Sequence, residues 1–185
     1  MKLEEKTLEK EYIYNGKIIN VRVDVAELPN GRTAKREVVE HPGGVAIVPL
    51  TDDMEVLLVK QFRYPYAEVI QEIPAGKLEK GEDPFESGKR ELKEETGATA
   101  EHYMDLGKFY PTPGYCGEII HLYAAWGLSF GDQDLDEDEF LNVEKVPLQK
   151  LCEDIIDGKI RDGKTQTAIL KTMAHVKRGD IEIKK

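Results

Sequence analysis

Three glutamates in one short segment are the residues with the clearest chemical potential. Glu91, Glu94 and Glu95 are spaced i, i+3 and i+4, so on a helix they share one face. Like charges at this spacing destabilise a helix by about 0.2–0.5 kcal/mol per pair. The face can be a solvated one, relieved by neighbouring basic side chains. It can equally be a site for Mg²⁺ or Mn²⁺, which take oxygen ligands. The cluster alone leaves both interpretations open.

The local sequence predicts a helix over residues 84–96 that carries these glutamates. Asp83 is a suitable N-cap, Pro84 occupies the first helical position, and Glu86 completes a capping-box pattern. Gly97 is a suitable stop. A separate face, formed by small and apolar residues, is expected to pack on a sheet: Phe85, Gly88 and Leu92. The carboxylates should therefore point away from the core, into a cleft.

The spacing of the surrounding residues decides between the two interpretations. From Gly76 the chain reads GKLEKGEDPFESGKRELKEETGA. It matches the Nudix box, G-x5-E-x7-R-E-U-x-E-E-x-G-U with U aliphatic, at nine positions: Gly76, Glu82, Arg90, Glu91, Leu92, Glu94, Glu95, Gly97 and Ala98. Only Ala98 departs slightly, because it is smaller than the usual aliphatic residue. The sequence resembles a Nudix hydrolase.

The resemblance implies an α/β (α+β) protein, an α/β/α sandwich with a mixed central sheet, in which the box forms a loop, a helix and a second loop. It implies that the three glutamates ligate a metal ion, with the carbonyl of Ala75 as a further donor. Gly76, Glu82, Arg90 and Gly97 are expected to be structural. Arg90 would orient the glutamates through a charge-assisted pair.

Metal-assisted cleavage of a diphosphate is the chemistry that the resemblance implies. A diphosphate repels a nucleophile because its oxygens are negatively charged. Bound Mg²⁺ neutralises that charge and lowers the pKa of a bound water. A carboxylate must then accept the water's proton, and in many Nudix enzymes this base lies outside the box.

Four stretches outside the box resemble the ADP-ribose pyrophosphatase branch of the family. They are AKREVVEHPGGVAIV, VLLVKQFRYP, FYPTPGYCGE with Pro113, and LDEDEFLNVEKV. By position, Arg36 and Glu37 would contact the adenine end of the substrate. Arg63 would approach the diphosphate or terminal ribose. Glu118 is a weaker substrate-contact candidate.

The acidic loop over residues 132–139 supplies the candidates for the general base. Glu137 and Glu139 would act as the base and as a ligand of an extra metal ion, and the sequence does not assign which does which. Glu94 is a further catalytic candidate. Each of these residues also has a structural interpretation, as a surface charge or a solvated loop. Their joint occurrence around a complete box favours function.

The order of the expected elements is that of a mixed α/β protein. The first third of the chain is predicted to be mainly β, with strands at 19–25 and 36–39 joined through the turn Pro29-Asn30-Gly31. Further strands and two closing helices are expected over these ranges: strands 45–50, 54–62, 68–73, 106–110, 119–126 and 141–146, and helices 148–157 and 165–177. Residues 1–40 are predicted to form a β arm and 41–185 the Nudix domain.

Composition limits the classes of partner. The chain has 185 residues and a net charge of −10, which argues against nucleic-acid binding. No apolar run approaches a membrane span, and no signal peptide is expected. Two cysteines fit a reducing compartment, so the cytoplasm is predicted. The resemblance implies a homodimer that exchanges the arm.

Two alternatives to ADP-ribose hydrolysis remain at this point. The first is a pyrophosphatase for GDP-mannose or another nucleotide sugar, since the choice of base depends on a few contacts. The second is a non-catalytic module that senses a nucleotide. Such modules typically lose box glutamates, and all of them are present here.

Overall fold

The computed structural model describes residues 2–135 and 139–183. Its contacts divide the chain into two compact units. The N-terminal unit comprises residues 1–43 and 110–119, and the central unit comprises residues 44–109 and 120–185. Within the described residues, no helix is long and apolar enough to cross a membrane.

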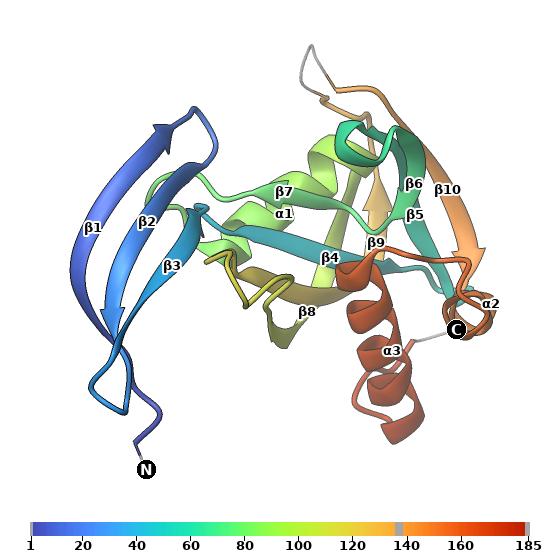
Figure 1. Cartoon of the computed structure of the whole chain (residues 1–185). Helices are drawn as coiled ribbons and strands as arrows, with labels where there is room; N and C mark the ends of the chain where they lie inside the picture. The colour runs from blue at the N-terminus through green and yellow to red at the C-terminus, as the bar shows by residue number, and fades with distance from the viewer. Residues whose placement is uncertain (1, 136–138, 184–185) are drawn as a thin grey trace. The chain divides into compact units, whose positions relative to one another are not determined.

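The N-terminal unit is a three-stranded antiparallel sheet in the order β1-β2-β3 (Figure 1). Its strands are β1 (Lys6–Asn15), β2 (Asn20–Glu27) and β3 (Thr33–Glu40). The predicted turn between β2 and β3 contains Gly31 at φ +80°, a conformation that suits glycine. The loop 110–119 joins this unit because the backbone of Val39 bonds to Tyr115 and Gly117.

The central unit contains a mixed seven-stranded sheet. Its main path is β10-β5-β4-β9-β8, with β6 beside β5 and β7 beside β4. β4 and β9 run parallel, while the other pairs are antiparallel. The strands are β4 (Gly44–Leu50), β5 (Glu55–Arg63), β6 (Glu68–Glu72), β7 (Ala75–Lys77), β8 (Ala98–Phe109), β9 (Ile120–Phe130) and β10 (Leu141–Pro147), and a short 3-10 helix, η1 (Tyr64–Tyr66), joins β5 to β6.

Helices cover both faces of this sheet. β4 is buried along its whole length, and its alternating side chains enter two separate cores. Ile47 joins Leu92 of α1 (Pro84–Thr96) in one core. Val48 joins the other core, which also contains residues of α2 (Leu148–Ile156) and α3 (Gly163–Arg178). The predicted α/β/α sandwich with a mixed central sheet is therefore confirmed.

Three strands differ from the expectation. β1 and β7 were not foreseen, and β8 begins at Ala98, directly after α1, instead of near residue 106. β1 is exposed at all ten positions, so it lacks the alternation that indicates a half-buried strand. Cross-strand pairing with β2 orders β1, and pairing with β9 extends β8. Both pairings join strands that are consecutive in the chain, but neither strand shows the alternation that would have predicted it.

Candidate active site

Helix α1 holds the box glutamates at a fixed rotation against the sheet. The side chain of Asp83 caps it by accepting hydrogen bonds from the backbone N of Phe85 at 3.0 Å and of Glu86 at 3.2 Å. The capping-box pattern predicts that the Glu86 carboxylate accepts a hydrogen bond from the cap residue. In the structure this carboxylate pairs with Lys89 instead, at 2.9 Å. Gly88 lies so close to β4 that an added Cβ would sit 2.9 Å from Ile47 Cδ1.

Two of the three box glutamates are less open to solvent than a cleft-facing position predicts. Glu91 is 8% exposed and Glu95 is 2% exposed, so both are buried. The backbone N of Ala75 donates a hydrogen bond to Glu95 Oε2 at 3.1 Å. A Cβ on Gly76 would lie 1.8 Å from Glu91 Oε1. The strand β7 therefore covers these carboxylates, which helical spacing alone does not reveal.

Arg90 ties the box together, as its expected structural role requires. Its guanidinium contacts Glu82 at 3.1 Å, Glu91 at 2.9 Å and Glu94 at 2.8 Å. The hydrogen bond from Arg90 holds the pKa of Glu82 below its usual range, and the same pair raises the pKa of Arg90. Glu82 also accepts from the backbone N of Glu79 at 3.0 Å, which closes the loop before the helix.

Burial makes two of the carboxylates reluctant to ionise. Desolvation raises the pKa of Glu91 to about 7, against a lowering effect from Arg90. Desolvation also raises the pKa of Glu95 to about 8, and the charge on Glu91 adds to the rise. The charge of Glu139 contributes a smaller rise at both residues. The structure thus brings Glu139, a predicted base or metal ligand, close enough to act electrostatically on α1.

The start of the acidic loop is anchored to the C-terminal end of α1. The backbone N–H of Gly131 donates to the carbonyl of Gly97 at 2.8 Å. The backbone N–H of Asp134 donates to the backbone carbonyl of Glu94 at 3.1 Å. The amide of Gln133 donates to the carbonyl of Glu95. These bonds satisfy carbonyls that a helix end leaves without a partner. Glu137, the other candidate base, lies outside the described residues.

The donor set suits a hard divalent cation. Buried carboxylates that repel one another gain free energy when a cation neutralises them, and oxygen donors are what Mg²⁺ prefers. Among the residues that the structure describes, there is no group of three or more His, Cys, Asp or Glu side chains placed to hold a metal ion. Glu94 and Glu91 are instead paired with the Arg90 guanidinium. A metal ion would compete with Arg90 for them.

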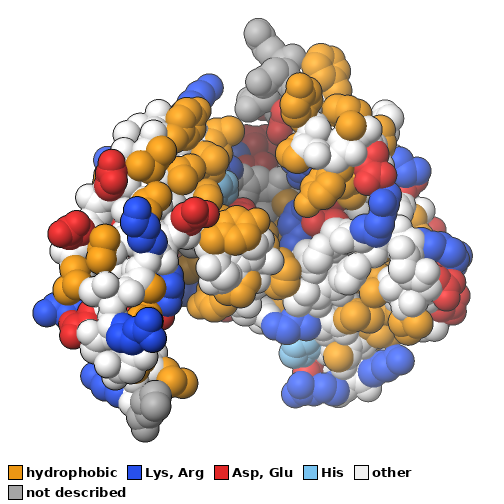
Figure 2. Space-filling view, viewed as in Figure 1, with side chains coloured by type: hydrophobic (Ala, Val, Ile, Leu, Met, Phe, Trp, Pro, Cys, Tyr) orange, Lys and Arg blue, Asp and Glu red, His pale blue; other side chains and the backbone are white. Residues whose placement is uncertain are grey.

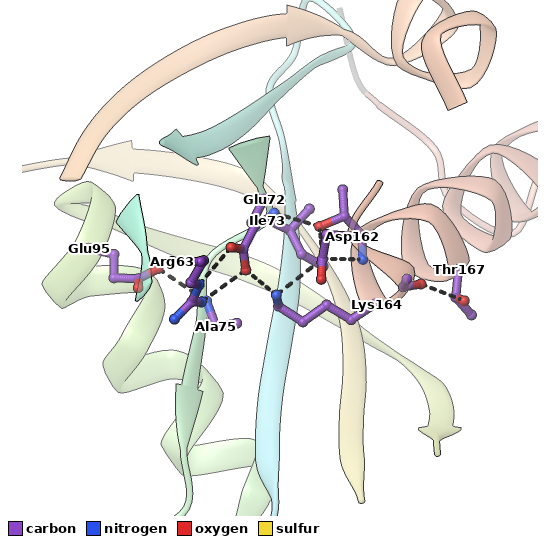
Figure 3. Close-up of polar contacts among 10 residues, drawn as sticks. Arg63, Glu72, Ile73, Ala75, Glu95, Asp162, Lys164 and Thr167 are labelled. Atoms are coloured by element: carbon purple, nitrogen blue, oxygen red, sulfur yellow. Dashed lines mark hydrogen bonds and ion pairs between the residues drawn. The ribbon is translucent and has the colours of Figure 1, made fainter. Parts of the chain in front are cut away.

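Arg63, expected at the diphosphate, lies at the end of β5 in a charged cluster (Figure 3). Its Nε is 2.7 Å from Glu72 Oε1 and its Nη2 is 2.9 Å from Glu72 Oε2. Hydrogen bonding to Glu72 raises the pKa of Arg63, and Glu95 contributes a smaller rise through its charge. Arg63 is thus electrostatically linked to the buried glutamates of α1.

The remaining predicted contacts belong to the N-terminal unit. Arg36 is exposed and pairs with Glu5 at 2.6 Å. Glu37 follows it on β3, so the two side chains point to opposite faces of the sheet. Glu118 lies 3.5 Å from the Nδ1 atom of His41. The roles of Arg36, Glu37 and Glu118 in substrate binding stay predictions.

Sequence reasoning missed three residues that contact the site: Glu72, Gln133 and Lys164. Glu72 pairs with Arg63, Gln133 with α1, and Lys164 with Glu72. Glu72 and Lys164 are 92 positions apart, and no spacing pattern signals such a pair. An isolated Glu in a strand and a Lys at a helix start are ordinary surface residues in sequence terms.

Comparison with known proteins agrees with this geometry. The model of the NUDIX domain matches residues 40–165, and that of the nucleoside diphosphate sugar hydrolase N-terminal domain matches residues 5–39. The ADP-ribose pyrophosphatase of Bacillus subtilis (strain 168) is 47% identical over 169 residues, covering 90% of this chain and 91% of that protein. The methanol dehydrogenase activator of Bacillus methanolicus is 46% identical, with 90% and 91% covered.

A solved structure gives the same result for the fold. The crystal structure of ADP compounds hydrolase superposes with a TM-score of 0.84, covers 97% of this chain and 98% of that chain, and is 23% identical. At this identity the likeness concerns the fold alone. With a family model matching well over half of the sequence, a complete box on α1 and the sandwich around it, the chain belongs to the Nudix hydrolase family.

Proposed function

We propose that the protein hydrolyses the diphosphate of ADP-ribose, with Mg²⁺, to AMP and ribose 5-phosphate. The observation that carries the chemistry is the burial of Glu91 and Glu95 beside the charge of Glu139. Buried carboxylates that repel one another favour the binding of a cation, and this supports the proposal. The choice of substrate is supported by the 47% identity to an ADP-ribose pyrophosphatase along nearly the whole chain.

Glu91, Glu94 and Glu95, with the carbonyl of Ala75, would hold the metal ion, and Mn²⁺ could substitute for Mg²⁺. When bound, the ion neutralises diphosphate oxygens and acidifies a bound water. Arg63 directs its guanidinium at the diphosphate and adds bidentate hydrogen bonds. Glu139, or Glu137 in the same loop, accepts the proton of the attacking water. Arg90 and Glu82 keep the glutamates in position.

The assembly that we propose is a homodimer that exchanges the arm of residues 1–40, with Arg36 and Glu37 at the adenine end of the substrate. Support comes from the exposed apolar side chains of β1, which Figure 2 shows among charged ones on this unit. Tyr12, Ile13 and Tyr14 are 49%, 59% and 56% exposed. Sedimentation of the full chain tests this proposal.

A cytoplasmic location fits the free cysteines, Cys116 and Cys152.

A substrate panel tests the proposed function. With Mg²⁺, the wild type should convert ADP-ribose to AMP faster than it converts GDP-mannose to GMP, and chelation of the metal should abolish both. Preference for GDP-mannose would transfer the proposal to nucleotide sugars. Tight binding of ADP-ribose without hydrolysis would indicate the non-catalytic sensor.

Glu95→Gln provides the matched test of the residues. It should reduce kcat by at least about a hundredfold, as expected when an electrostatic group is lost from a site, while the melting temperature stays unchanged or rises, because a neutral amide replaces a carboxylate that is costly to bury. Lys93→Gln, at a nearby position on α1, is the control and should keep wild-type activity. A fully active Glu95→Gln would contradict the metal role.

A further inference from the structure

Four charged side chains form a continuous row in the central unit, from the end of β5 to the start of α3 (Figure 3). Arg63 contacts Glu72 through two nitrogens, at 2.7 and 2.9 Å. Lys164 contacts the same carboxylate and lies 3.1 Å from Asp162. Glu72 therefore bridges Arg63 and Lys164, which are far apart in the sequence.

Burial along the row is uneven. The side chain of Glu72 is 3% exposed and that of Lys164 is 11% exposed, whereas that of Arg63 is 39% exposed. An ion pair with so little solvent is screened weakly, so each charge acts strongly on the next. Arg63 is the end of the row that remains open to a ligand.

The charge balance makes Lys164 significant. Glu72 by itself would neutralise Arg63, and a neutral pair attracts a diphosphate only weakly. Lys164 supplies the compensating charge to Glu72. The Asp162 carboxylate is engaged in capping α3, since its Oδ2 accepts from Thr165 N at 2.9 Å and from Thr165 Oγ1 at 2.6 Å. Asp162 keeps its negative charge, which also acts on Arg63. Lys164 nevertheless offsets the charge of Glu72, so Arg63 is more electropositive than it would be beside Glu72 alone.

The backbone fixes Lys164 opposite Glu72. The next residue, Thr165, is fully buried and its Oγ1 accepts from the backbone N of Ile73 at 2.9 Å. Two residues after Ile73, the backbone N–H of Ala75 donates a hydrogen bond to Glu95 Oε2. The segment 72–75 is thus held by α3 on one side, and it carries a partner of Arg63 at one end and a partner of Glu95 at the other.

We propose that Lys164 is a positioning residue for substrate binding: by holding and neutralising Glu72, it keeps the Arg63 guanidinium oriented and electropositive toward the substrate diphosphate. The proposal rests on the proposed function, in which Arg63 binds that diphosphate. Lys164 itself acts through Glu72 and Arg63 and does not touch the substrate.

Steady-state kinetics separate this role from a general loss of structure. Lys164→Met should raise KM about tenfold while kcat stays within about threefold, because Arg63 contributes mainly to binding. Lys164→Arg should keep KM within about threefold of the wild type. The control is Lys171→Met, which removes a charge from the same helix and a contact from Lys171 to the Leu106 carbonyl. It should leave KM unchanged.

A double variant distinguishes charge balance from packing. Glu72→Gln/Lys164→Met removes both charges of the buried pair and leaves Arg63 uncompensated. Its KM should therefore fall back from the Lys164→Met value toward that of the wild type. A packing role predicts the opposite, that the double variant is at least as impaired as Lys164→Met. A wild-type KM in Lys164→Met, or the same loss in Lys171→Met, would overturn the proposal.

Calorimetric binding of α,β-methylene ADP-ribose, which cannot be hydrolysed, keeps the two proposals distinguishable. If the wild type turns over neither ADP-ribose nor GDP-mannose, the proposed function fails. The inference then stands if Lys164→Met binds the analogue about tenfold more weakly than the wild type and Lys164→Arg does not. Equal affinities, or no binding by the wild type, would refute it.

Discussion

Gly76 and Glu91 lie against each other where β7 passes over α1. The Glu91 carboxylate occupies the space that a side chain at position 76 would need, since a Cβ there would be 1.8 Å from Oε1 and 1.9 Å from Cδ. Arg90 also contacts this carboxylate, at 2.9 Å. A glycine in this part of the box is thus required by a side-chain contact, in addition to any turn in the backbone.

Gly76→Ala should displace the Glu91 carboxylate and weaken the metal site. We expect the concentration of Mg²⁺ for half-maximal activity to rise about 10–100-fold, the range typical of changes beside metal ligands. Titrating activity with Mg²⁺ measures this. Gly81→Ala, in the turn that follows β7, is the control, because nothing lies within 4 Å of its added Cβ, although its φ of +82° strains the backbone. Equal Mg²⁺ requirements in both variants would contradict the contact's role.

At the level of secondary-structure elements, Gly97 ends α1 and also contacts the start of the acidic loop, which leads to Glu139. Gly97 ends the helix at φ +69°, and its added Cβ would lie 2.3 Å from the carbonyl oxygen of Gly131. Gly131 in turn donates to the Gly97 carbonyl at 2.8 Å. The helix end and the loop are therefore one hydrogen-bonded unit.

Gly97→Ala should reduce both stability and kcat. A left-handed alanine costs about 1–2 kcal/mol, and displacement of the Gly131 carbonyl should add about 1 kcal/mol or more. Gly179→Ala is the matched control, since Gly179 ends α3 at φ +79° with nothing within 4 Å of the added atom. Denaturant unfolding and kcat measure the difference. Equal losses in the two variants would show that the loop contact has no effect.

At the scale of the whole molecule, a net charge of −10 is combined with carboxylates that are buried inside the fold. Burial raises the pKa of Glu91 to about 7 and of Glu95 to about 8, from 4.5. These two carboxyl groups therefore bind more protons in the folded protein than in the unfolded chain between about pH 4.5 and 8. Their contribution to the free energy of unfolding falls as the pH rises through this window.

Metal-free protein should therefore melt at a lower temperature at pH 8.5 than at pH 6. We expect a difference of about 5 °C or more, since one pKa unit corresponds to about 1.4 kcal/mol and 1 kcal/mol moves the melting temperature of a domain this size by roughly 2–4 °C. Added Mg²⁺ should stabilise the protein more at pH 8.5, because ligands must be deprotonated to bind.

Thermal unfolding in a chelator, with and without excess Mg²⁺, measures this dependence. Glu95→Gln is the control variant, and its melting temperature should depend less on pH. A wild type whose stability without metal is the same at both pH values would show that the buried carboxylates are not the source of the effect.

Features that depend on neighbouring residues could be predicted before the structure was known. The box register, the bounds of α1 and the stop at Gly97 follow from caps and spacing within one segment, and α1 spans Pro84–Thr96 as predicted. The α/β/α sandwich with a mixed central sheet was inferred from the family resemblance and is confirmed. Local interactions can be predicted from the sequence because the residues that make them are close along the chain.

The surroundings of the glutamates could not be predicted from local sequence patterns. The burial of Glu95 depends on Ala75, 20 positions away, and the partner of Glu72 is 92 positions away on α3. Burial and long-range ion pairing arise when distant segments displace water together, so no short window of the sequence contains the information that specifies them.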